Sequence, residues 1–360
     1  MAKIDKSILY FIYLFFIISI FSIYQTLSIL PTYMDDILIK QIIWYIIGFF
    51  IIFIIVKMDN KIIFKYYKFY YLLFVILLIG LFFFAPVINN AVCWYKIPLL
   101  GSFQPSEFMK IILIINIAYV LDGYTVKTKK DEFFLLLKIF FIFFIPAFLT
   151  YLQPDTGIVI IYLIITVTMI FTSKLSLFWY IVITICILMI LLIFVFIYFF
   201  DIDLFIKIFG DNFLRINRII NWTSNDGYQL QNGMAAIGGG GLFGYLKTPI
   251  YFPEPHTDFI FATYASNLGF FGSVFLITTI VLFDIKLINV ALKQNKKNKY
   301  IVCGIIGMLF YQQVQNIAMT FGLLPITGIT LPFISYGGSS LISYMILIGI
   351  VLNMTKKTTI

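Results

Sequence analysis

Long apolar stretches dominate the chain, and short polar or charged segments separate them. A membrane-spanning helix needs about 20 predominantly apolar residues. Breaks at clusters of charged residues, proline and glycine leave ten such stretches: 8–29, 41–56, 69–88, 107–121, 133–151, 156–172, 177–200, 258–284, 300–322 and 333–353. The apolar runs are continuous, without the alternation of a transmembrane β-barrel. The pattern predicts an all-α, polytopic integral membrane protein with ten transmembrane helices.

Composition supports this prediction and excludes other classes of protein. Hydrophobic residues make up 62% of the chain and charged residues only 11%, with a mean hydropathy of +1.04. Soluble domains have about 45–50% apolar and about 25% charged residues, so a soluble enzyme is excluded. With one histidine and three cysteines, the chain has neither a disulfide framework nor a histidine-ligated metal cluster.

The charges indicate how the chain is oriented. Lys and Arg number 25 against 16 Asp and Glu, a net charge of +9. Most of the lysines fall on one side of the predicted spans, together with both termini, and basic residues collect on the cytoplasmic side of membranes. Both termini are therefore expected in the cytoplasm. Because this bias explains the positive charge, no nucleic-acid partner is expected.

This orientation places three longer polar segments outside the cell, at 89–106, 201–257 and 323–332. Apolar residues punctuate the longest one, so 201–257 is expected to be a partly folded extracellular loop that stays close to the membrane. A turn at 153–157 is expected to join two spans as a tight hairpin. No internal repeat divides the chain, so 1–360 is expected to form a single membrane domain.

Charged residues near spans are functional candidates by default, and five lie on the expected outer side: Glu107, Lys110, Asp155, Glu254 and Asp258. Glu107 and Lys110 are three residues apart and share a helix face. They form either a snorkelling pair behind Ser106 as N-cap, or a polar patch in a cavity that opens outward.

The segment 252–261 is the sharpest chemical feature. Two prolines stiffen a loop that brings Glu254, His256 and Asp258 to the start of a span at Phe259. Thr257 or Asp258 could simply cap that helix. Alternatively, a carboxylate there could accept a proton from a substrate hydroxyl, which typically accelerates a reaction about 10²–10⁴-fold.

Two glycine-rich segments have structural interpretations. Residues 236–244 lack the Lys-Ser/Thr of a phosphate-binding loop, so a turn is expected there. Residues 332–340, with Ser339 among their small side chains, suit close helix packing or the lining of a polar cavity.

Five motifs together resemble the RodA/FtsW/SpoVE family, the shape, elongation, division and sporulation (SEDS) proteins. In chain order they are QPSEF..K at 104–110, QPDTG at 153–157, AIGGGGLFG at 236–244, PEPHTDFIFA at 253–262 and LPITGITLPFISYGGSS at 324–340. The resemblance extends from about residue 89 to residue 353.

The resemblance implies a peptidoglycan glycosyltransferase of the bacterial cytoplasmic (inner) membrane. Such proteins polymerise lipid II, the undecaprenyl-pyrophosphate-linked disaccharide-pentapeptide, on the outer membrane face, in elongation, division or sporulation. The catalytic aspartate of the family falls on Asp258. The implied substrate-binding residues are Trp94, Ser106, Glu107, Lys110, Arg218, Glu254, His256 and Ser339. A class B penicillin-binding protein is the implied partner. A divalent cation, Mg²⁺ or Mn²⁺, could bridge the pyrophosphate, but the sequence identifies no metal site.

Two departures and two alternatives accompany the resemblance. Cys93 stands where the family usually has a basic residue, and Ser266-Asn267 replace an acidic pair; neither departure touches Asp258. A flippase for lipid II, or a non-catalytic scaffold that recruits a synthase, would use similar features. A flippase must expose its site to both membrane faces, whereas the motif charges cluster on the outer side, which favours the enzyme.

Overall fold

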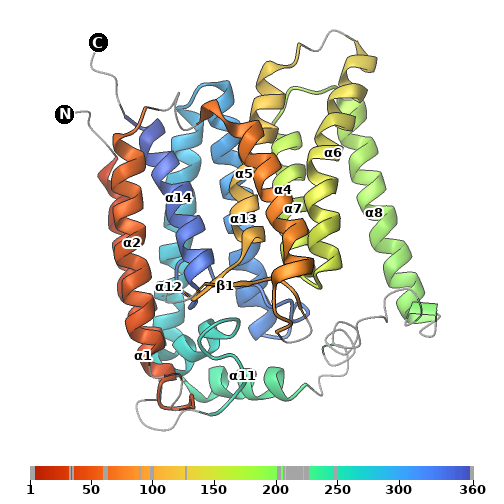
Figure 1. Ribbon diagram of the computed structural model, residues 1–360. Helices are drawn as coiled ribbons and strands as arrows, with labels where there is room; N and C mark the ends of the chain where they lie inside the picture. Colours follow the sequence, from red (N-terminus) through yellow and green to blue (C-terminus); the bar gives the residue numbers. More distant parts are fainter. Residues whose placement is uncertain are drawn as a thin grey trace.

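The chain forms a bundle of long helices in a computed structural model (Figure 1). The structure describes residues 5–31, 34, 36–59, 64–88, 91–97, 101–125, 128–200, 204–205, 207, 222, 227–245 and 250–356. The helices are α1 (Lys6–Thr26), α2 (Ile37–Lys57), α4 (Tyr67–Phe84), α5 (Pro105–Gly123), α6 (Lys129–Leu152), α7 (Thr156–Phe171), α8 (Leu177–Phe200), α11 (Tyr228–Gly239), α12 (Ile260–Leu292), α13 (Lys296–Thr320) and α14 (Gly338–Met354). A two-stranded antiparallel hairpin joins β1 (Tyr95–Ile97) to β2 (Gly101–Phe103).

Within the described residues, seven helices are long and apolar enough to cross a membrane: α1, α2, α4, α6, α8, α12 and α13. Helices α7 and α14 are also apolar but shorter, with 16 and 17 residues. A helix satisfies all its interior backbone groups within one segment, which is why apolar chains cross bilayers in this form. The predicted class, a helical polytopic membrane protein, is confirmed; the count of ten spans stays a prediction.

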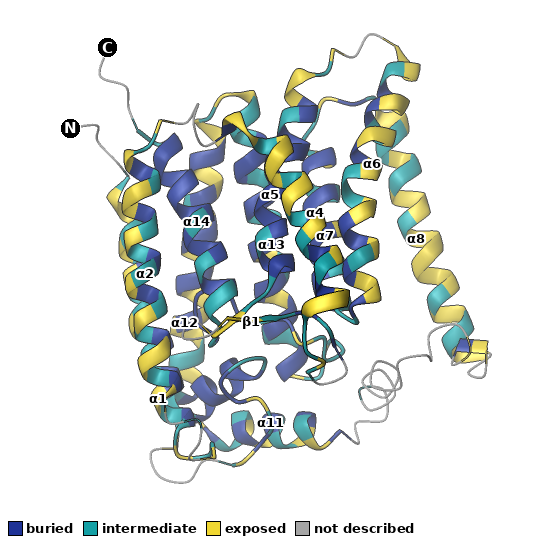
Figure 2. Cartoon of the chain, in the orientation of Figure 1, coloured by how far each residue is buried: buried dark blue, intermediate teal, exposed yellow. Residues whose placement is uncertain are grey.

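Helix α5 lies at the centre of the bundle and α8 at its edge. Nearly every residue of α5 is buried against α4, α6, α7, α13 and α14. Helix α8, by contrast, has no buried residue although it is the most hydrophobic helix, and Figure 2 shows its exposed surface along its length. Lipid is the solvent in which such a surface is stable.

Helices α2 and α14 pack closely where glycines remove side-chain volume. A Cβ atom at Gly338 would lie 2.6 Å from the ring of Trp44, and one at Gly48 would lie 2.6 Å from Met345. Contacts this short leave no room for a methyl group. The close packing predicted for the small residues around 338 is confirmed.

The predicted start of the last span at 333 is wrong, because α14 begins at Gly338. Polar side chains of α1 and α2 donate hydrogen bonds to the carbonyls of residues 333–335, so these carbonyls are not paired within a helix. Ser19 donates to the carbonyl of Ile334 (2.8 Å), Gln41 to that of Ser335 (3.3 Å), and Tyr45 to that of Phe333. Residues 333–337 therefore form a loop wedged between helices.

The span predicted at 258–284 is longer and is interrupted. Helix α12 runs to Leu292, and Gly269 breaks it with a φ of 63°. The glycine-rich stretch after α11 pairs with the break: Tyr245 N donates to Ser266 O (2.8 Å) and Phe270 N to Gly241 O (2.8 Å). The turn expected at 236–244 is confirmed only from Gly240 onward, because 236–239 close α11.

The segments around the polar end of the bundle follow local rules. Helix α5 starts at Pro105 with Gln104 as N-cap, so the N-cap predicted at Ser106 is wrong; proline suits the first helical position because that position needs no N–H. The turn between α6 and α7 confirms the predicted hairpin, with the Asp155 carboxylate accepting from Ile158 N (3.3 Å). Helix α11 lies across the same end of the bundle (Figure 1).

Candidate functional site

A cavity of about 840 Å³ lies at this polar end. Its walls come from α2, the β-hairpin, the starts of α5 and α14, the α6–α7 turn, α13 and the loop before α12. Five of the residues predicted for the site line it: Trp94, Glu107, Glu254, Asp258 and Ser339. The fold thus brings together residues that are up to 245 positions apart by numbering.

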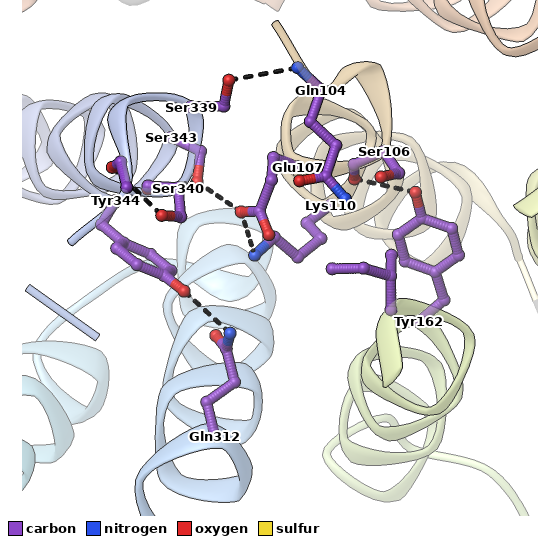
Figure 3. A network of polar contacts seen from close by, with 12 residues as sticks. Gln104, Ser106, Glu107, Lys110, Tyr162, Gln312, Ser339, Ser340, Ser343 and Tyr344 are labelled. Carbon is purple, nitrogen blue, oxygen red and sulfur yellow. Dashed lines mark hydrogen bonds and ion pairs between the residues drawn. The ribbon is translucent and has the colours of Figure 1, made fainter. Parts of the chain in front are cut away.

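Where Glu107 lines the cavity, it forms a buried ion pair with Lys110 (Figure 3). The Lys110 Nζ lies 2.6 Å from Glu107 Oε2 and 4.9 Å from the centre of the Tyr344 ring. Ser343 donates to Glu107 (3.3 Å), and Gln312 donates to the Tyr344 hydroxyl (2.8 Å). Because Lys110 is fully buried, the snorkelling interpretation is wrong; of the pair, Glu107 reaches the cavity and Lys110 lies beneath it.

A second chain of polar contacts crosses the cavity wall through Gln104. The Trp94 indole N–H donates to Gln104 Oε1 (3.1 Å), and Gln104 Nε2 donates to Asp155 Oδ2 (2.8 Å). The backbone N–H of Gln104 donates to Ser339 Oγ (3.1 Å). Sequence reasoning named Trp94 and Ser339 but missed Gln104. This residue belongs to the motif at 104–110, in which only the charged residues and Ser106 were chosen as candidates.

The loop before α12 presents Glu254 and Asp258 to the cavity. The N-cap of α12 is Phe259, and it makes no side-chain capping bond, so the capping position predicted for Thr257 or Asp258 is wrong. The Thr257 hydroxyl instead donates to the Glu254 carboxylate. Glu254 itself has a φ of 54°, a left-handed conformation that fixes a sharp turn between the two prolines.

His256 and Ser106 are buried and do not line the cavity. The His256 carbonyl accepts from Tyr336 N (2.8 Å), and its ring lies 5.7 Å from the Tyr336 ring. Burial lowers the pKa of His256, with Glu254 opposing the shift, so its imidazole is neutral at pH 7. The carbonyl of Ser106 accepts from the Tyr162 hydroxyl (2.8 Å). The predicted Arg218 lies outside the described residues.

The cavity is acidic within the described part of the chain. Four carboxylates line it (Glu107, Asp155, Glu254 and Asp258), and among the described lining residues Lys40 is the basic one. No group of three or more His, Cys, Asp or Glu side chains in the described ranges could hold a metal ion. The described residues alone therefore form no protein cage for a cation.

Asp155 lies in the turn between α6 and α7, and burial raises its pKa from 3.8 to about 6. A raised carboxyl pKa favours the neutral form in the folded state, so this stabilisation is present below pH 3.8 and is lost as the pH rises through about 6. Asp155→Asn, which stays neutral, should gain thermal stability relative to the wild type between pH 5 and pH 8, by on the order of 2–4 °C. Thermal unfolding in detergent at both pH values measures this; a difference that is the same at pH 5 and pH 8 contradicts it.

Comparisons with known proteins found a family and a relative in sequence. The sequence matches the family described as "Cell cycle protein", which groups FtsW, RodA and SpoVE, over residues 5–360. It is 31% identical over 330 residues to the "Probable peptidoglycan glycosyltransferase FtsW" of Wigglesworthia glossinidia brevipalpis, covering 87% of this chain and 82% of that protein.

Two solved structures have the same fold. One is a chain from a study of "polymerization and crosslinking by a peptidoglycan synthase complex", with a TM-score of 0.79, 22% identity, and coverage of 98% of this chain and 97% of that one. The other is the Rod shape determining protein RodA of Thermus thermophilus, with a TM-score of 0.69, 23% identity, and coverage of 99% of both chains.

Proposed function

The chain belongs to the FtsW, RodA and SpoVE family, and we propose that it is a peptidoglycan glycosyltransferase that polymerises lipid II. One observation carries the assignment to this chain's own residues: the carboxylate-bearing loop 253–258 lies in the wall of a cavity of about 840 Å³ that four carboxylates line. Four of the five motifs, at 104–110, 153–157, 253–262 and 324–340, contribute residues to that cavity, as an active site requires.

In this reaction Asp258 is the general base. Its carboxylate accepts the proton of the acceptor sugar hydroxyl, whose oxygen then bonds to the anomeric carbon of the donor sugar. The bond between that carbon and the pyrophosphate oxygen breaks, and the lipid-linked pyrophosphate leaves with the bonding electron pair. Glu107 and Lys110 stabilise the cavity floor, and Trp94, Glu254 and Ser339 contact the substrate from the walls.

The membrane arrangement in this proposal follows the charge bias of the sequence. The chain is a multi-pass membrane protein, and the proposal places it in the bacterial cytoplasmic membrane with ten spans, both termini inside and 201–257 outside. The first turn of α1 and the last turn of α14 lie at the same end of the bundle (Figure 1), as an even number of spans requires. Residues 1–360 then form one membrane domain, with the cavity on the outer face.

A partner and a cation complete the proposal. The structural relative taken from a synthase complex supports a class B penicillin-binding protein as the partner that crosslinks the strands. Mg²⁺ or Mn²⁺ would be held mainly by the substrate's pyrophosphate, since Mg²⁺ is commonly bound by few carboxylates together with substrate phosphates. No catalytic step above depends on the cation.

The test is polymerisation by the purified protein with its partner transpeptidase. Lipid II and Mg²⁺ or Mn²⁺ are added, and glycan strands are resolved by gel electrophoresis. Ladders of strands support the glycosyltransferase. Movement of fluorescent lipid II across vesicles without strand formation would identify a flippase, and neither activity would leave a scaffold.

A further inference from the structure

The loop that carries Asp258 is held mainly through its own carbonyl groups. The loop, residues 253–258, contains two prolines and ends where α12 starts. Five of its carbonyls each accept a hydrogen bond from another element or from α12. These bonds are Gln229 Nε2 to Pro253 O (3.2 Å), Thr263 Oγ1 to Pro255 O (2.9 Å), Tyr336 N to His256 O (2.8 Å), Ser335 Oγ to Thr257 O (2.7 Å) and Asn316 Nδ2 to Asp258 O (2.8 Å). The position of the loop therefore depends on distant residues.

Asn316 on α13 holds Asp258 itself, and it makes a second bond of the same kind. Its Nδ2 donates to the carbonyl of Asp258 and to that of Ile329, both at 2.8 Å. A side-chain amide nitrogen has two hydrogens, and these two bonds use both. The opposite amide orientation would place an oxygen against two carbonyl oxygens, so the bonds themselves fix the assignment.

These two hydrogen bonds, the Asn316 bridge, join two parts of the cavity wall through a residue that does not line the cavity. Asp258 and Ile329 both line the cavity, whereas Asn316 is fully buried and is not among the lining residues. The carbonyl of Asp258 lies outside the helical ladder of α12, since the first bond, from Thr263 N (3.2 Å), goes to Phe259 O. Asn316 therefore donates to a carbonyl that accepts no hydrogen bond from the backbone of α12.

We infer that Asn316 is a positioning residue for Asp258, in a role that rests on the glycosyltransferase proposed above. It holds the backbone of Asp258 to that of the cavity-lining segment 327–330 (the 329 segment) and thereby fixes where the Asp258 carboxylate starts, and it does not touch the substrate. Displacements of about 1 Å at a reacting group can cost about 100-fold in rate. Loss of the bridge should therefore lower kcat while leaving substrate binding largely intact.

Asn316→Asp tests this inference because it keeps the shape of the side chain and replaces the donating amide with an accepting carboxylate. Gln315→Glu is the matched control. Gln315 is the adjacent residue, is also buried, and donates to Pro325 O (2.9 Å), a carbonyl outside the Asp258 loop. Both substitutions make the same chemical change, so the general cost of a buried carboxylate appears in both.

The expected result is a 10–100-fold lower kcat per folded molecule for Asn316→Asp, with KM for lipid II within about threefold. Gln315→Glu should keep kcat within about threefold of wild type even if its thermal stability falls equally. Equal kcat for the two variants would overturn the inference. If Asn316→Asp does not fold, Asn316→Ala replaces it, with Gln315→Ala as the matched control and the same expectation.

Hydrogen exchange keeps this inference separate from the proposed function. Asn316→Asp should speed amide exchange in the peptide spanning 254–262, whereas Gln315→Glu should not. Faster exchange in Asn316→Asp, found together with a wild-type protein that makes no glycan, would support the positioning role of Asn316 and reject the polymerase. Unchanged exchange together with an active wild type would reject the bridge alone.

Discussion

Asp258→Asn is expected to lower the rate of glycan polymerisation by about 10²–10⁴-fold, the usual contribution of a general base. Asparagine matches the size of aspartate but cannot accept the proton of the sugar hydroxyl. Because Asp258 lines an existing cavity, the loss should fall on kcat more than on KM. Polymerisation of lipid II at several substrate concentrations measures both constants.

The control for this prediction is Asp122→Asn. Asp122 is an exposed carboxylate near the C-terminal end of α5, far along the helix from Glu107. It carries the same change in charge and should keep wild-type activity. Polymerisation by Asp258→Asn at the wild-type rate would remove Asp258 from the catalytic role. Thermal unfolding of both variants shows whether any loss of activity reflects misfolding.

Removing one partner of the Glu107–Lys110 pair is expected to destabilise the protein by about 3–5 kcal/mol. Lys110→Met leaves the Glu107 carboxylate buried and without its counter-charge, 2.6 Å from where the ammonium was. Glu107→Gln leaves the Lys110 ammonium in the same position. Removing both charges in the double variant should restore much of the stability, because no uncompensated charge remains. Thermal unfolding in detergent gives the four values of this double-mutant cycle.

Lys40→Met provides the contrast. Lys40 pairs with Asp36, but the two side chains are 50% and 55% exposed, and exposed pairs are typically worth about 0–1 kcal/mol. A Lys110→Met variant no less stable than Lys40→Met would show that the 107–110 pair is solvated. A double variant less stable than either single variant would show that the pair does more than neutralise its own charges.

The sequence predicted where helices form because the bilayer leaves a chain few choices. Each of the ten apolar stretches overlaps one helix, since a segment without water must satisfy its backbone internally. The boundaries failed where tertiary contacts took backbone groups away from a helix. Ser19, Gln41 and Tyr45 hold the carbonyls of 333–335 outside α14.

The site was predictable where residues were charged and near a span, because burying a charge demands a reason. Glu107, Glu254 and Asp258 stood out on that ground, and all three line the cavity. Neutral amides gave no such signal. Gln104 links Trp94 to Asp155, and Asn316 links the Asp258 loop to the 329 segment, yet in the sequence they are ordinary polar residues.

The sequence by itself determined that the chain is a membrane protein and which residues carry its few charges. Through its motifs it also determined the family that the chain resembles. Only the tertiary structure decided which of these residues share a cavity: Trp94 and Ser339 line it, whereas Ser106 and His256 lie behind its wall. The physical reason is one of range. Hydropathy and charge act residue by residue and can be read along the chain, but a cavity is enclosed by contacts between segments that only folding brings together.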